Sequence, residues 1–327
     1  MPQPTGKGRV LLTGATGFVG TYLLPALLDA GHDVRCGSRT PPAVGPGSAT
    51  WVRLDVDDER SLAPALEECE FAVYLVHSLD SGAGYEAREQ RAAARFAKAA
   101  ARAGCRRIVY LGGVSPRAHP SRHLRSRAAT GAALRAGTVP VVELQAGIII
   151  GPGSASWDLL RDIAVRAPWL PEVHWLRSRL SPLAIHDVTA AITHALTDPN
   201  CEGGVFDLPG PEILSARALL ERTAALAGRE PAWISVPLLP RRVASRVLPL
   251  VTRAQPTLTR ELLAGLGADL VGSAPRYWEM HPHHKLLSLP EAIRQALERE
   301  RHQQSLRVHV AEALIAALTP WARGLSG

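Results

Sequence analysis

The chain has 327 residues, of which 46% are hydrophobic and 20% are charged. This composition excludes a chain that is mainly disordered, and the length suits one large domain or two unequal ones. The formal net charge is +7, with acidic residues interleaved among basic ones, so the charge favours a phosphorylated ligand over nucleic acid as a partner.

Cysteine usage and hydropathy indicate the compartment. Cys36, Cys69, Cys105 and Cys201 are widely spaced, with neither a C-x-x-C pair nor zinc-ligand spacing. We interpret them as small core residues in a reducing cytoplasm. The apolar run at residues 313–318 is far shorter than the roughly 20 residues that a membrane span requires. We therefore expect a soluble, cytoplasmic protein with no membrane partner.

Strands and helices alternate along the first part of the chain. Short apolar runs predict strands at residues 9–13, 33–38, 51–54, 71–76, 107–111 and 139–146. Helical spacing of apolar residues predicts helices at residues 18–30, 61–68, 86–103 and 124–136. Because this alternation with short connections demands a parallel sheet covered on both faces, the predicted fold is α/β, a Rossmann-type doubly wound sheet.

The regular alternation of predicted strands and helices ends near Gly151. A helix is predicted at residues 185–196 and a strand at 204–208, and further helices are predicted at residues 216–227, 257–266, 290–300 and 305–318. We expect a Rossmann-type domain at residues 7–209 and a smaller, mainly helical lobe at residues 210–327. The last helix carries an apolar stripe, which favours docking against the body of the protein. The alternative is a homodimer contact.

A glycine-rich turn joins the first strand to the first helix. Gly14 allows the tight turn, Gly17 allows the backbone to approach a pyrophosphate, and Gly20 allows the helix to pack close to the sheet. The helix N-terminus then offers unpaired N–H groups to the phosphates. This strand–turn–helix context favours a dinucleotide over a ligand-free turn. The predicted contacts are Gly14, Thr16, Gly17, Phe18, Val19 and Gly20.

The end of the second strand distinguishes NADP from NAD. An NAD site usually has Asp or Glu about 20 residues beyond the glycines, whereas this chain has Ser38 and Arg39. An Arg fork matches phosphate geometry, so we predict NADP, with NAD as the alternative and a solvated Arg39 as the competing interpretation. Further cofactor contacts are predicted at the ends of later strands, from Asp55, Val56, Val76, His77 and Gly112.

These motifs together resemble the short-chain dehydrogenase/reductase superfamily. The similarity lies in residues 13–20, in Asp55 and in the segment after Leu111, and the TGATGFVG form is similar to the extended and atypical branches. The HLRSR and PLAIHDV segments, at residues 123–127 and 182–188, are similar to an atypical NmrA-like, nucleoside-diphosphate-sugar-epimerase-like group. The resemblance implies NAD(P) binding. It also implies the absence of the Tyr-x-x-x-Lys pair that carries the chemistry elsewhere in the superfamily.

The resemblance places two unusual residues at the catalytic positions. His123 stands at the Tyr position and Arg127 at the Lys position, and Ser115 is the hydroxyl nearest to the missing upstream Ser. An imidazole can act as a general acid near neutral pH, while Arg127 can bind ribose hydroxyls but cannot shuttle a proton. Both residues are predicted to be catalytic. The competing interpretation is two ordinary polar residues at a helix start.

The predicted function is an NADPH-dependent reduction or isomerisation of a small carbonyl substrate. The alternative is a non-catalytic NAD(P) redox sensor or assembly factor, because the Tyr and Lys are absent. Asp187 is expected to make a structural hydrogen bond. Trp157, Trp169 and Trp175 could stack on a flat ligand, although packing between the lobes is the favoured interpretation. No metal site is predicted, since Pro282 breaks the helical spacing of the nearby histidines.

Overall fold

The computed structural model describes residues 7–43, 45, 47–77, 84–114, 120–167, 169–236, 243, 244, 252, 259, 263, 268–272 and 276–303. Ser115, the predicted helix at residues 305–318 and most of the predicted helix at 257–266 lie outside these residues. None of the helices in the described part of the chain is long and apolar enough to cross a membrane.

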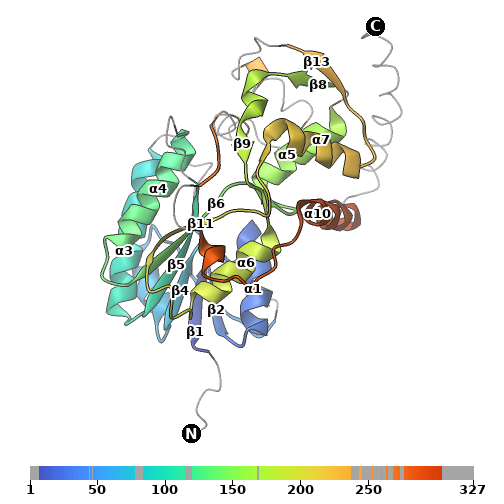
Figure 1. Cartoon of the computed structure of the whole chain (residues 1–327). Helices are drawn as coiled ribbons and strands as arrows, with labels where there is room; N and C mark the ends of the chain where they lie inside the picture. Colours follow the sequence, from blue (N-terminus) through green and yellow to red (C-terminus); the bar gives the residue numbers. More distant parts are fainter. Residues whose placement is uncertain are drawn as a thin grey trace.

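A seven-stranded sheet forms the centre of the first lobe (Figure 1). All neighbouring strands pair in parallel, in the order β3-β2-β1-β4-β5-β6-β11. This order confirms the predicted Rossmann-type doubly wound fold. The strands are β1 (Arg9–Thr13), β2 (Asp33–Ser38), β3 (Thr50–Arg53), β4 (Phe71–Tyr74), β5 (Arg107–Gly113), β6 (Val141–Ala146) and β11 (Gly204–Leu208).

Helices cover both faces of this sheet because its strands are apolar on both sides. Val10 and Leu12 of β1 pack in the core with α1 and α6, whereas Leu11 packs in the opposite core with α2 and α3. This is the period of two that a strand imposes on its side chains. The covering helices are α1 (Phe18–Asp29) and α6 (Ile185–Ala195) on one face, and α2 (Glu59–Leu66), α3 (Tyr85–Arg102) and α4 (Arg122–Arg135) on the other.

A second hydrophobic core lies beyond the carboxyl ends of the strands (Figure 1). It includes residues from both sides of the predicted boundary at 209/210, and that boundary stays a prediction. The helices here are α5 (Ala155–Arg166), α7 (Ala216–Leu226) and α10 (Leu289–Gln303), with the short helix η1 (His174–Arg177). Three strand pairs accompany them: β7 (Ile149–Ile150) with β10 (Leu183–Ala184), β8 (Trp169–Glu172) with β13 (Ala232–Ser235), and β9 (Arg179–Leu180) with β12 (Leu214–Ser215). The short helix η3 (Tyr277–Glu279) packs instead on the first core, through Tyr277 and Trp278.

Helix α5 was not predicted, although its start has a local signal. The Ser154 hydroxyl caps it by accepting a hydrogen bond from the Trp157 amide at 3.5 Å. A serine followed by apolar residues at helical spacing is the usual N-terminal pattern. The glycines that precede Ser154 obscured this signal, because they indicate a loop.

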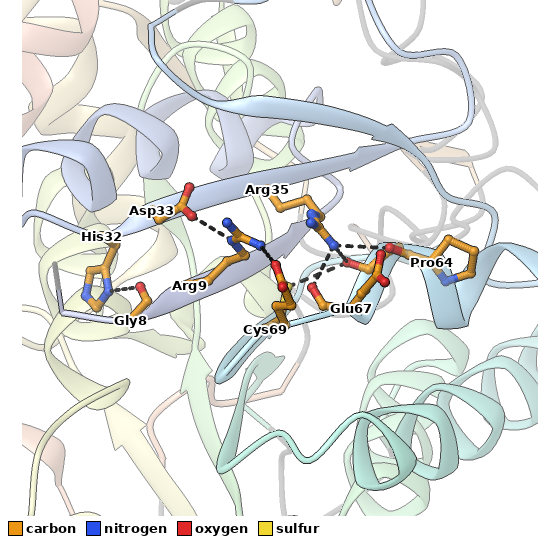
Figure 2. Close-up of polar contacts among 10 residues, drawn as sticks. Gly8, Arg9, His32, Asp33, Arg35, Pro64, Glu67 and Cys69 are labelled. Atoms are coloured by element: carbon orange, nitrogen blue, oxygen red, sulfur yellow. Dashed lines mark hydrogen bonds and ion pairs between the residues drawn. The ribbon is translucent and has the colours of Figure 1, made fainter. Parts of the chain in front are cut away.

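Polar contacts tie together the amino-terminal ends of the strands (Figure 2). Arg9 of β1 pairs with Asp33 of β2, with 2.6 Å between Nε and Oδ2. Arg35 donates to the carbonyls of Pro64 and Glu67, at 3.1 and 2.7 Å, and so holds β2 against the end of α2. These contacts are at the opposite edge of the sheet from the carboxyl ends, where ligands bind in such folds.

Candidate active site

A pocket of about 1270 Å³ opens at the carboxyl ends of the strands. Its position fits the general rule for doubly wound sheets. The structure brings every predicted site residue into the lining of this one pocket, while the role of each stays a prediction. These residues are Gly14, Thr16, Gly17, Phe18, Val19, Gly20, Ser38, Arg39, Asp55, Val56, Val76, His77, Gly112, His123 and Arg127.

The glycine turn has the close packing that a pyrophosphate requires. Gly14 has a φ of +64°, which favours glycine, and its carbonyl accepts a hydrogen bond from the Gly17 amide at 2.9 Å. A Cβ added to Gly20 would lie 2.3 Å from the Gly14 carbonyl oxygen. Gly17 is the N-cap of α1 and makes no side-chain cap. The first amides of α1 are therefore available to an anion.

Thr13 holds the ends of two central strands in place. Its buried hydroxyl donates to the Val73 carbonyl at 3.0 Å and accepts from the Leu75 amide at 3.0 Å. Both partners belong to β4 or follow it directly, and Leu75 lines the pocket. The hydroxyl thus fixes the relative position of the glycine turn and the loop after β4.

The predicted 2′-phosphate contacts lie at an exposed edge of the pocket. Arg39 is exposed, and the Ser38 hydroxyl donates to the Thr40 carbonyl at 3.2 Å. The nearby Asp57 carboxylate is neutralised by Arg95, at 3.1 Å. The Asp55 carboxylate accepts from the Asp57 amide at 3.0 Å, which builds the turn before α2. Among the described residues that line this edge of the pocket, Arg39 is the exposed cation.

His123 and Arg127 lie one turn apart on α4 and share one face of it. The Arg127 guanidinium donates to the Leu111 carbonyl, and the Tyr110 hydroxyl donates to the Arg127 carbonyl at 2.9 Å. The His123 and His77 rings are 5.4 Å apart between centroids. The i, i+4 spacing in the sequence already indicated a shared face. The fold adds His77, which comes from the loop after β4.

The His123 imidazole is mainly neutral near pH 7. Burial, and then the charge of Arg127, lowers the pKa of His123 to about 4. At pH 7 the neutral form of His123 therefore predominates. His123 can therefore donate a hydrogen bond from its neutral ring, whereas Arg127 supplies a fixed positive charge.

Asp187 and the three tryptophans that the sequence singled out lie in different parts of the structure. Asp187 accepts from His284 Nε2 at 2.9 Å and from the Leu287 amide at 3.1 Å, which confirms its structural hydrogen bonding. Trp169 and Trp175 line the pocket. Trp157 is fully buried and donates to Glu300 at 2.8 Å.

One group of potential metal ligands lies outside this pocket, and the sequence analysis did not identify it. The ligand atoms of His194, Asp198 and His281 lie within 4.8 Å of one another. His281 Nε2 lies 3.0 Å from Asp198 Oδ2, and His194 Nδ1 lies 3.3 Å from the Tyr277 hydroxyl. These contacts join the segment at the end of α6 to η3 and the residues that follow it. The absence of a metal site stays a prediction.

Comparison with known proteins supports the assignment of the first lobe. Residues 14–137 match a family described as NAD(P)H-binding. This part of the chain is therefore similar to NAD(P)H-binding domains. The match, together with the fold, confirms the resemblance to short-chain dehydrogenases/reductases.

The curated relatives match only part of this chain. A ceramide reductase from Caulobacter vibrioides is 28% identical over 195 residues, which cover 57% of this chain and 60% of that protein. The chain spans 60% or less of the length of the curated relatives it matches.

Solved structures share the fold across most of the chain. An NADPH-dependent quinone oxidoreductase from Escherichia coli, complexed with NADPH, has a TM-score of 0.70 at 18% identity and covers 87% of this chain and 98% of its own. A UDP-glucose 4-epimerase from Thermus thermophilus, complexed with NAD, has a TM-score of 0.65 at 17% identity and covers 90% of this chain and 99% of its own. At these identities the likeness concerns the fold alone.

Proposed function

We propose that the protein is an NADP(H)-dependent oxidoreductase of the atypical short-chain type, which reduces or isomerises a carbonyl substrate. One observation carries this proposal. A pocket at the carboxyl edge of the sheet is lined by the glycine turn, Arg39 and the His123–Arg127 pair, and also by residues of the second core. The relative named as a reductase supports the oxidoreductase assignment. The four buried, unpaired cysteines support a cytoplasmic location.

The residues present fit a pyridine dinucleotide. The uncapped amides of α1 suit the pyrophosphate, and the close approach of Gly20 to the Gly14 carbonyl and to Ala15 holds the start of α1 against the turn. Arg39 and Ser38 would hold the 2′-phosphate, and Asp55 would border the adenine. When bound, NADPH supplies the hydride that a carbonyl carbon gains, while the carbonyl oxygen takes a proton from solvent.

The chain's own contribution is orientation and charge. The neutral His123 ring would donate a hydrogen bond to the substrate oxygen. Arg127, which is 9% exposed, would bind ribose hydroxyls and stabilise negative charge that develops on that oxygen. This arrangement replaces the protonating Tyr of the superfamily with donors that do not change protonation state near pH 7.

A second candidate is a non-catalytic NAD(P) redox sensor. The observation that favours it is the low pKa of His123, because an imidazolium that is rarely present is a poor proton source. The two candidates differ in turnover. Reduction of a carbonyl panel that falls in His123→Ala favours the enzyme, and tight cofactor binding without any turnover favours the sensor.

The NADP preference is tested by calorimetry with NADPH and NADH on wild type and on Arg39→Ala. We expect NADPH affinity to fall about 5–30-fold, or roughly 1–2 kcal/mol. A charge-assisted hydrogen bond contributes less free energy at an exposed site than at a buried one, so we take the lower part of its usual contribution. NADH affinity should not change. The control is Arg102→Ala, an exposed arginine at the end of α3 that does not line the pocket. Equal losses for both cofactors would exclude the proposed role of Arg39.

A further inference from the structure

The pocket divides into two chemically different halves. One half holds the glycine turn and the charged or titratable lining residues, among them Arg39, Asp55, His123 and Arg127. The other half, which we name the apolar compartment, reaches into the second core between α5, β8, η1 and α7. It is lined by residues that include Leu159, Leu160, Ile163, Leu170, Trp175 and Leu220.

The apolar compartment is large enough for a substantial ligand. The whole pocket, at about 1270 Å³, exceeds the roughly 300–1,000 Å³ of a typical single-ligand site. The cofactor contacts are confined to the charged half. The volume beyond them therefore suits the body of a second, sizeable molecule.

The described residues that line the compartment offer no charge to neutralise an anionic ligand. From Ala146 onward, none of the described residues in the lining is charged, and only Ser154 and Ser156 carry hydroxyls. These two hydroxyls already contact each other at 3.1 Å. A diphosphate or carboxylate placed here would lose its hydration without gaining a cation, which is costly.

Two arginines on the helices that border the compartment, Arg161 and Arg217, are paired with acidic partners. Arg161 on α5 is buried and pairs with Asp162 at 3.0 Å and with Glu300 at 2.9 Å. Arg217 on α7 pairs with Glu221 at 2.9 Å. Moving either cation to a ligand would break these pairs, and in the case of Arg161 would take a buried cation away from two buried carboxylates.

We propose that the substrate is an uncharged carbonyl or alcohol compound with an extended hydrocarbon body, and not a nucleotide sugar. The body lies in the apolar compartment, and the oxygen-bearing carbon lies at the boundary near His123. This inference rests on the proposed function for the position of the reacting carbon. The sequence predicted a small carbonyl compound, whereas the compartment favours a large apolar one.

The first test is a series of methyl ketones from 2-butanone to 2-decanone. We expect kcat/KM with NADPH to rise about fourfold for each added methylene, because each buried methylene gains about 0.8 kcal/mol. In parallel, calorimetry on protein saturated with NADP⁺ should show the same rise in affinity and a negative heat-capacity change. UDP-glucose should show no binding and no competition with 2-decanone.

The second test places a charge in the compartment. Ile163 is partly buried in the lining, so Ile163→Lys should remove most of the dependence on chain length while NADPH affinity stays unchanged. Ile163→Ala should reduce the dependence on chain length by a smaller amount. This variant replaces Ile163→Lys in the test if the lysine variant fails to fold. Ile213→Lys is the control, because Ile213 is 39% exposed and does not line the pocket.

The outcomes separate the inference from the proposed function. Ketone binding that rises with chain length without any turnover would support the inference and contradict the oxidoreductase function. Turnover that does not rise with chain length, or UDP-glucose binding that displaces 2-decanone, would overturn the inference. An unchanged length dependence in both Ile163 variants would also overturn it.

Discussion

Substitution of Gly20 by alanine tests how closely α1 approaches the glycine turn. The added Cβ would lie 2.3 Å from the Gly14 carbonyl oxygen and 2.7 Å from Ala15 Cα. Both neighbours are backbone atoms, so they cannot move aside as a flexible side chain would. Helix α1 must shift away from the turn, and overpacking of this kind costs about 1–3 kcal/mol. The same shift displaces the amides that we assign to the pyrophosphate.

Two measurements follow for Gly20→Ala. The free energy of unfolding in urea should fall by about 1–3 kcal/mol, and calorimetry should show NADPH affinity weakened by at least about tenfold, or roughly 1.4 kcal/mol. The matched control is Gly203→Ala, since a Cβ there would lie 3.5 Å from its nearest neighbour, the Val141 carbonyl oxygen. A Gly20→Ala protein as stable as wild type, with the same NADPH affinity, would refute the assigned geometry of the turn.

Two further predictions concern His123 and Asp187. The pKa of His123 is about 4 in the folded chain and about 6.5 when unfolded. As the pH falls from about 6.5 towards 4, the unfolded chain therefore binds a proton that the folded chain does not, and the free energy of unfolding decreases. His123→Asn should therefore lose less stability than wild type between pH 7 and pH 5 in urea unfolding, and equal losses would contradict the burial of a neutral ring. Asp187→Ala leaves the Leu287 amide without its acceptor, so it should cost about 1–3 kcal/mol of stability. NADPH affinity should stay unchanged, and weaker binding without a stability loss would point instead to a direct role in the site.

Local patterns in the sequence predicted the first lobe well. Strands β1 and β2 begin and end at the predicted residues, because short apolar runs bounded by turn residues carry their own signal. The glycine turn was likewise predicted from adjacent residues. The predicted site residues meet in one pocket because parallel strands present all of their carboxyl ends at one edge of the sheet.

Pairing between distant segments could not be predicted. Strand β7 has two residues and pairs with β10, more than 30 residues later in the chain. Strand β8 pairs with β13, which is further away still. Such short strands have no period of their own, and they exist because a distant partner completes their hydrogen bonds. The group of His194, Asp198 and His281 was missed for the same reason.

The sequence by itself determined the alternation of strands and helices, the glycine turn, and the replacement of Tyr and Lys by His123 and Arg127. Only the tertiary structure decided that His123 is neutral near pH 7 and that the pocket continues into an apolar compartment. Both properties depend on burial. Burial is produced jointly by segments that are far apart in the chain, so a local pattern does not contain it.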